Sequence, residues 1–272
     1  MRKKLVITRY DERAPKQSQV MPQGSAVALC PRAKELQASI QSEPQQRDAY
    51  IELASELAKQ MLFRESAEVL STCLLRWPFD WEAYYLRGRR HLSIMNYGQS
   101  AADLEMSARL LPDHWGIEYH RGIIHFIRGD FEKSARAFSN SLSLSKDGES
   151  EISVANWYWF VLTRLGKKAD ADRLAAGVQQ DIDYGENYSY YKCMMLYRGM
   201  LTVEEALKVD EDDIPDVTLA VNAYGVANYL LAKGKKQEAR HYLQMVVDAV
   251  EHTMWSAFAY HAAMADLKRI EF

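Results

Sequence analysis

A short pattern recurs three times along this chain at a spacing of 34 residues. "LFRESAEVL" (62–70) is followed by "NYGQSAADL" (96–104) and "DFEKSARAF" (130–138). At this period the same columns hold an aromatic residue, Ser, Ala and a large apolar residue: Phe63/Tyr97/Phe131, Ser66/Ser100/Ser134, Ala67/Ala101/Ala135 and Leu70/Leu104/Phe138. Agreement in this many columns indicates a repeat array, in which each repeat is one supersecondary unit.

Each repeat holds two segments of about 12–15 residues whose apolar positions are three and four apart, which predicts a pair of amphipathic helices. Small residues share a column on the first helix, at Ala54, Gly88 and Gly122, and the Ser column lies on the second helix. We expect these small residues to let the paired helices approach closely. One pair cannot cover its own apolar face, so neighbouring pairs must stack into a continuous core.

These features resemble the tetratricopeptide repeat, whose pattern is W-x2-L-G-x2-Y…A-x3-F…P. The second unit matches it at Tyr84, Arg87, Gly88, His91, Ser100, Leu104 and Pro112, and the third at Glu118, Arg121, Gly122, His125, Ser134, Phe138 and Lys146. Ser replaces the family's Ala, Arg replaces its Leu, and the third unit lacks the proline. The chain after residue 31 also resembles a bacterial tetratricopeptide subfamily of unassigned biochemistry. The resemblance implies an all-α fold, a right-handed α-solenoid of stacked antiparallel helix pairs.

The solenoid is predicted to span residues 31–272. Its units are expected at about 47–80, 81–114, 115–148, 152–182, 185–212 and 220–251, with a capping helix over 254–272. A further helix is expected to begin at Pro31, and the spacing of Thr202 and Glu205 is that of a capping box, which predicts a helix from Val203. Residues 1–30 hold the β-prone runs "KLVITRY" and "SAVALC". They predict an N-terminal arm, either extended or a short hairpin, with a loosely ordered tail as the alternative.

Composition narrows the function. The chain is 48% hydrophobic and 26% charged with a net charge of −3, so nothing points to nucleic acid as a partner. Its three cysteines are far apart and show no metal-ligand spacing. No signal peptide is evident at the N-terminus, and no apolar run is long enough to span a membrane, so the expected location is the cytoplasm.

No catalytic motif is present. The sequence lacks GxSxG, a phosphate-cradling loop and a glycine-rich dinucleotide turn. In "DHWGIEYH", His114 and Glu118 are one helical turn apart, but the spacing is not that of HExxH. The acidic segment "VDEDDIPD" lacks the glycine and alternation of an EF-hand loop. The sequence therefore predicts no enzyme, no cofactor and no metal site.

Binding of a protein or peptide segment is the function that the resemblance favours, because first helices line the concave groove in tetratricopeptide proteins. In the register set by Gly88 and Gly122, the predicted groove residues are Tyr85, Arg89, Tyr119, Phe126, Asn156, Phe160, Tyr224 and Asn228. Aromatic side chains supply contact area, and Arg and Asn supply hydrogen bonds to a carboxylate or a peptide backbone. Residues 157–160 are four consecutive aromatics, so at least two of them must pack in the core.

Charged residues near this groove divide into two groups. Arg87 and Arg121 are expected to pair with Asp103, Glu105 or Glu118, which leaves Arg89 for a partner's carboxylate. The family's two-carboxylate clamp for chaperone tails is not expected here, because the first unit offers Ile51 and Ser55 at inward positions.

Two alternatives to a scaffold or adaptor remain open. One is a homodimer formed through the C-terminal helix or the N-terminal arm. The other is a ligand-sensing regulatory module with a pocket near residues 157–160.

Overall fold

The computed structural model describes residues 28–210 and 214–272, so the predicted N-terminal arm lies almost entirely outside the described residues. The described residues form 14 helices, α2 to α15, and no strand. The chain divides into two compact units, Met1–Pro112 (unit 1) and Asp113–Phe272 (unit 2). The predicted all-α repeat fold is confirmed, although the array expected over 31–272 is shared between these two units.

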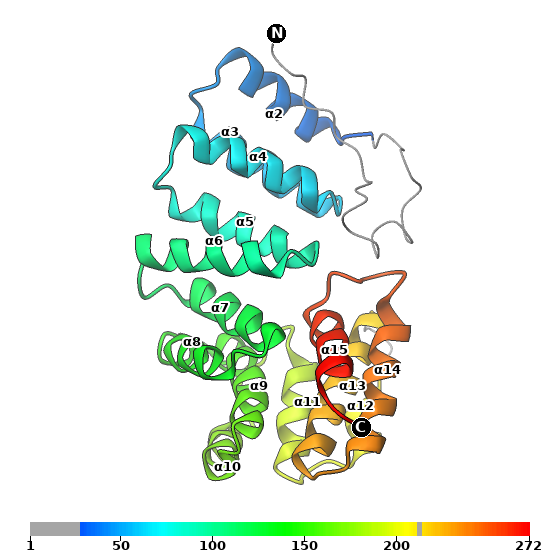
Figure 1. Ribbon diagram of the computed structural model, residues 1–272. Helices are drawn as coiled ribbons and strands as arrows, with labels where there is room; N and C mark the ends of the chain where they lie inside the picture. The colour runs from blue at the N-terminus through cyan, green and yellow to red at the C-terminus, as the bar shows by residue number, and fades with distance from the viewer. Residues whose placement is uncertain (1–27, 211–213) are drawn as a thin grey trace. The chain divides into compact units, whose positions relative to one another are not determined.

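In unit 1 each described helix packs on the next one along the chain (Figure 1). The helices are α2 (Pro31–Ser42), α3 (Arg47–Lys59), α4 (Phe63–Arg76), α5 (Trp81–Ser93) and α6 (Tyr97–Leu110). The predicted start of α2 at Pro31 is confirmed, since proline is well tolerated in the first turn, where its missing N–H is not needed. Helices α3–α4 and α5–α6 are the first two repeats.

Unit 2 continues the pattern of paired helices. It contains α7 (Trp115–Arg128), α8 (Phe131–Ser143), α9 (Gly148–Arg164), α10 (Lys168–Gly177), α11 (Tyr188–Tyr197), α12 (Val203–Leu207), α13 (Pro215–Ala232), α14 (Lys236–Val250) and α15 (Phe258–Arg269). The predicted start of α12 is confirmed, with Thr202 and Glu205 forming the capping box. Helix α9 begins at Gly148 rather than at 152, because Asp147 and Ser150 form another capping box there.

The small residues of the 34-residue period lie where paired helices touch. Gly88 of α5 faces Leu104 of α6, and Gly122 of α7 faces Phe138 of α8. A Cβ atom on Gly122 would lie 2.6 Å from both Cδ1 and Cζ of Phe138, far inside van der Waals contact. The expected close approach of the paired helices is therefore confirmed.

Serines at the repeated positions also form hydrogen bonds between the paired helices. The Ser66 hydroxyl donates to the Ala54 carbonyl at 2.6 Å, and Ser134 donates to the Gly122 carbonyl at 2.7 Å. A second column repeats the arrangement, with Ser107 donating to the Trp81 carbonyl at 2.8 Å. These bonds satisfy the three buried hydroxyls and tie α4, α6 and α8 to the backbone of α3, α5 and α7, whereas the buried Ser100 hydroxyl of the first column makes no hydrogen bond to the described residues.

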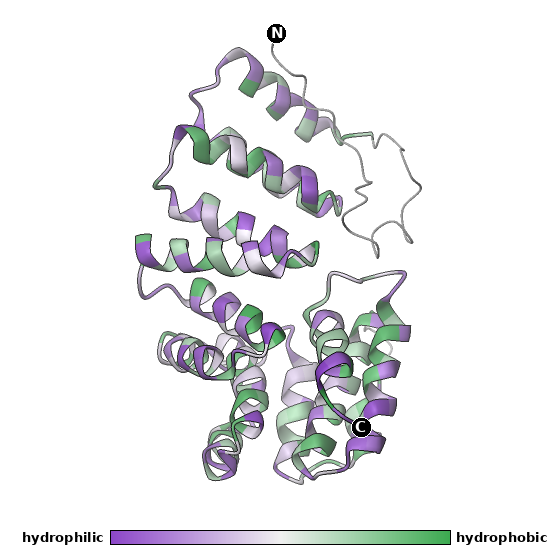
Figure 2. Cartoon of the chain, in the orientation of Figure 1, coloured by the Kyte–Doolittle hydropathy of each residue, from purple (hydrophilic) through white to green (hydrophobic). Residues whose placement is uncertain are grey.

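Side-chain polarity follows the packing of the helices. Figure 2 shows that most helices carry both hydrophobic and hydrophilic residues, as an amphipathic helix requires. Within the aromatic run of α9, Trp157, Trp159 and Phe160 are buried and Tyr158 is half-buried, which confirms that at least two are core residues. None of the helices in the described part of the chain combines the length and apolarity needed to cross a bilayer.

Candidate functional site

The predicted groove residues lie in two different environments. Tyr85 and Arg89 of unit 1 are half-buried on α5, and the Arg89 guanidinium lies 5.5 Å from the centroid of the Tyr85 ring. The six predicted groove residues of unit 2 are all buried: Tyr119, Phe126, Asn156, Phe160, Tyr224 and Asn228. Their side chains therefore contact neighbouring helices instead of lining an open groove.

Helix α15 explains much of this burial. It packs on α7, α13 and α14, and is the red helix in Figure 1. The Phe258 ring lies 6.5 Å from that of Tyr119, and the Tyr224 hydroxyl donates to the Asp266 carboxylate at 2.8 Å. The sequence predicted that the last helix would cap only the final repeat. In the structure it also covers α7, the first helix of unit 2, because Arg269 and Phe258 both reach that helix.

A buried charge cluster holds the second half of α15. Asp266 has no exposed surface and accepts hydrogen bonds from Arg164 of α9 at 3.0 Å and from Arg269 at 2.8 Å. Arg164 also donates to the Asn228 side chain at 2.8 Å. Burial, and then the nearby Asp266 carboxylate, raise the pKa of Tyr224, so this hydroxyl stays a hydrogen-bond donor.

Arg269 occupies a site built from α7 and the start of α8. Its Nη1 donates to the carbonyls of Phe126 at 2.9 Å and Ile127 at 3.2 Å, at the C-terminal end of α7. Its guanidinium lies 5.4 Å and 5.2 Å from the ring centroids of Phe126 and Phe131. Gly129 has φ of 83°, and a Cβ there would lie 3.2 Å from Nη1. A helix C-terminus and two aromatic faces both favour a cation.

Arginines in both units make the ion pairs expected from the sequence. Arg87 donates twice to the Asp103 carboxylate, at 2.8 Å and 2.7 Å, and once to Ser71. Arg121 donates to Glu118 at 2.5 Å. The prediction that these two arginines form internal pairs is confirmed.

Arg89 and Arg90 differ from these paired arginines. Within residues 28–210 and 214–272, neither has an ion pair, and the buried Nε of Arg90 has no hydrogen-bond partner. Burial, followed by the charge of Arg89, lowers the pKa of Arg90 to about 10. The sequence interpretation selected Arg89 alone. The run "RGRRH" contained Arg90 too, but its burial was not readable from the pattern.

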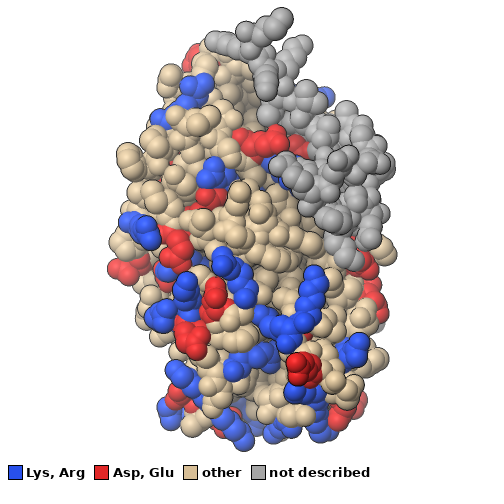
Figure 3. All heavy atoms as spheres, viewed as in Figure 1, with Lys and Arg blue, Asp and Glu red and all other residues tan. Residues whose placement is uncertain are grey.

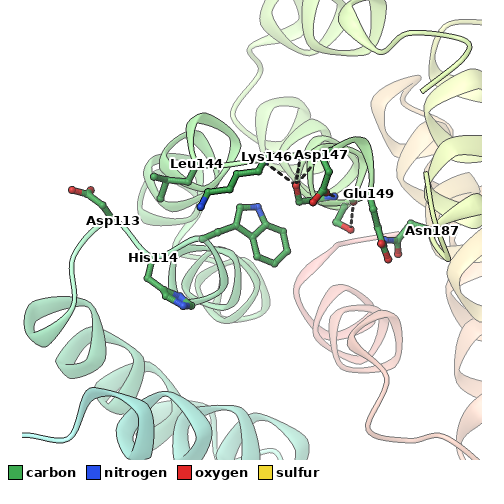
Figure 4. A pocket seen from close by; sticks show the side chains of 10 residues that line it. Asp113, His114, Leu144, Lys146, Asp147, Glu149 and Asn187 are labelled. Carbon is green, nitrogen blue, oxygen red and sulfur yellow. Dashed lines mark hydrogen bonds between the residues drawn. The ribbon is translucent and has the colours of Figure 1, made fainter. Parts of the chain in front are cut away.

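A pocket of about 560 Å³ lies within unit 2, between the starts of α7 and α9 (Figure 4). Its charged lining residues are Asp113, Lys146, Asp147 and Glu149. Two of these already have local roles, because Asp147 caps α9 by accepting from the Ser150 N–H at 2.7 Å, and Glu149 accepts from Asn187 at 3.4 Å. The pocket therefore carries no separate functional assignment.

The histidines considered as metal ligands have structural contacts. His114 caps α7 by accepting from the Ile117 N–H at 3.3 Å, and the His120 ring hydrogen-bonds the Gly116 carbonyl at 2.7 Å. In the described part of the chain no group of three or more His, Cys, Asp or Glu residues is placed to hold a metal ion.

On the face shown in Figure 3, Lys and Arg side chains lie among Asp and Glu.

Comparison with known protein families and with curated proteins found no match. Solved structures do match. A tetratricopeptide repeat protein from Parabacteroides merdae has a TM-score of 0.56 at 13% identity, covering 85% of this chain and 91% of its own. YrrB, a TPR protein with an unusual peptide-binding site, has a TM-score of 0.51 at 15% identity, covering 85% and 99%. Yeast Tom70 has a TM-score of 0.51 at 14% identity, covering 98% and 68%. The chain therefore has the fold of the tetratricopeptide repeat proteins.

Proposed function

We propose that this chain is a non-catalytic protein-binding scaffold whose helix α5 binds an acidic peptide segment. The observation that carries the proposal is the pair Arg89–Arg90, which has no carboxylate partner among the described residues, whereas Arg87 on the same helix has one. The lowered pKa of Arg90 means that burial and the charge of Arg89 destabilise its positively charged form. A carboxylate of a bound partner would stabilise that charge.

The geometry suits recognition of a short segment. The Arg89 guanidinium stacks on the half-buried Tyr85 ring, which fixes its direction at low entropic cost. A planar guanidinium offers two parallel N–H donors to a carboxylate, and partial burial strengthens the bonds. We expect a partner with Asp or Glu beside an apolar residue, bound along α5.

Structures with the same fold support a scaffold. YrrB has a peptide-binding site, and Cut9, at a TM-score of 0.51 and 14% identity, is part of the Cut9–Hcn1 hetero-tetramer. Both likenesses concern the fold, so the partner of this chain has to be found by experiment.

A peptide-display selection on the full chain tests the proposal. Enriched peptides are expected to be acidic, to weaken with added salt, and to bind Arg89→Glu at least tenfold less tightly, a loss of about 1.4 kcal/mol or more. Arg109→Glu is the matched control, because Arg109 is an exposed arginine on α6 of the same unit. Enriched peptides that bind Arg89→Glu and wild type equally would contradict the proposed surface.

A further inference from the structure

Helices α7, α9, α13 and α14 of unit 2 form the surface, called the wall below, against which α15 packs, and three residues of α15 contact it at distinct positions. Phe258 lies against Tyr119 and His120, with ring centroids 6.5 Å and 5.6 Å away. Asp266 lies against the Arg164 guanidinium, and Arg269 lies at the C-terminal end of α7. Along α15 these three residues follow the pattern aromatic-x7-Asp-x2-Arg. At 100° per residue, positions 0, 8 and 11 fall within about 80° of one another on one helix face.

We propose that this wall is a helix-binding surface, that α15 is its intramolecular occupant, and that the external partner is a helix of another protein with the same pattern. The proposal rests on the scaffold function argued above but concerns a different surface. A partner helix would bind by taking the place of α15.

The contacts of α15 define what a partner helix would have to supply. Its buried face carries three alanines, Ala259, Ala262 and Ala263, beside the larger, fully buried side chains of Tyr260 and His261. Phe258, Asp266 and Arg269 add directional contacts with the wall. A helix that supplied these three side chains and an aromatic residue at the Tyr260 position would reproduce most of the interaction.

The wall also discriminates between helices. Arg164 is only 13% exposed, and its partner Asp266 is fully buried, so a helix with an uncharged residue at that position would leave a largely buried guanidinium without its carboxylate. At the arginine position, the wall offers two backbone carbonyls and two aromatic faces, which together favour a cationic hydrogen-bond donor over an acidic or apolar side chain. The surface therefore favours helices that carry a carboxylate and a cation at these two positions.

A free partner helix must compete with α15 of the same chain for the wall. A tethered helix has an effective concentration in the millimolar range, so an identical free helix binds the intact chain weakly. Weakening α15 without changing the wall should raise the apparent affinity, because the binding-competent fraction increases.

The test uses the full chain and a fluorescent synthetic peptide of residues 254–272 as the probe. We expect weak binding to wild type, and at least tenfold tighter binding to the full-length Phe258→Ala/Arg269→Ala variant, which loosens α15 and leaves the wall intact. The same peptide with Asp266→Asn should lose this gain. Lys268→Ala is the matched control, because Lys268 is the exposed basic residue next to Arg269.

Hydrogen exchange of the wild-type chain keeps the proposal falsifiable if the double variant folds poorly. Amides of α15 are expected to exchange through an opening that leaves α13 and α14 protected. Loss of protection in all three helices through one common opening would show that α15 is a fixed part of the core and would overturn the proposal. A wild-type dimer in light scattering, dissociated by the peptide, would assign the surface to a second copy of the chain and would also overturn it.

The two proposed surfaces can fail separately. Arg89→Glu should leave peptide 254–272 binding unchanged, and Phe258→Ala/Arg269→Ala should leave binding of acidic display peptides to α5 unchanged. Display peptides that bind Arg89→Glu as tightly as wild type would therefore count against the α5 surface only.

Discussion

Replacing Gly122 by alanine is expected to destabilise unit 2, although alanine is the better helix former. The gain in helix propensity is about 1 kcal/mol. Against it stands the contact with Phe138, whose ring is fully buried and cannot move aside freely. Overpacking of this kind costs about 1–3 kcal/mol, and separating α7 from α8 would also strain the Ser134–Gly122 hydrogen bond, worth about 1 kcal/mol. The net expectation is a loss of about 1–3 kcal/mol.

Urea unfolding followed by circular dichroism measures this change. Gly98→Ala is the matched control, because Gly98 is also helical but no atom of a neighbouring element lies within 4 Å of the position that its added methyl group would take. It should stabilise its own unit by about 0.5–1 kcal/mol. Gly122→Ala combined with Phe138→Leu should regain part of the loss. If Gly122→Ala alone proves as stable as wild type, close helix approach is not the reason for the small-residue column.

Three further predictions address other contacts. Asp103→Asn should destabilise unit 1 by about 2 kcal/mol in urea unfolding, because it leaves the Arg87 guanidinium without its carboxylate. Burial lowers the pKa of His261 to about 4. The unfolded chain, with a histidine pKa of about 6.5, binds more protons between pH 6.5 and 4, so unit 2 should lose up to about 3 kcal/mol as pH falls through this window, and His261→Gln should remove that loss. Thr202→Ala should destabilise α12 by about 1 kcal/mol and speed its hydrogen exchange, whereas Thr202→Ser should not.

Most of the fold could be predicted because the residues that pack between paired helices recur at the same positions of each 34-residue repeat. Gly88 and Gly122 fall in one column, and both lie against a large residue of the paired helix. The 34-residue period predicted Ser66 and Ser134 only as small residues at the contact between paired helices. Their hydrogen bonds to backbone carbonyls were not predicted. The period of apolar residues indicates which face of a helix a residue occupies, but it does not identify the residue's hydrogen-bond partner.

The candidate site was less predictable for the same reason. Periodicity predicted Phe126 and Tyr224 as groove residues for a partner, but in the structure both are buried and lie beside residues of α15. Arg164 and Asp266 are 102 residues apart, a separation at which no short motif links them. Arg89 was singled out by its inward register and its charge, whereas its neighbour Arg90 needed the burial seen in the structure.

The contact between Arg269 and Phe126 joins residues 143 apart in sequence. In simple helical arrays each repeat touches only its neighbours, so folding can start anywhere and the ends can unravel first. Closure of α15 onto α7 adds contacts of long sequence separation, which slow folding because a large loop must close before they form. During synthesis the aromatic wall of unit 2 is complete before α15 emerges from the ribosome. The nascent chain thus passes through a stage in which the aromatic surface of this wall is exposed to solvent. Chaperones would bind the chain most usefully at that stage, because exposed apolar surface promotes aggregation.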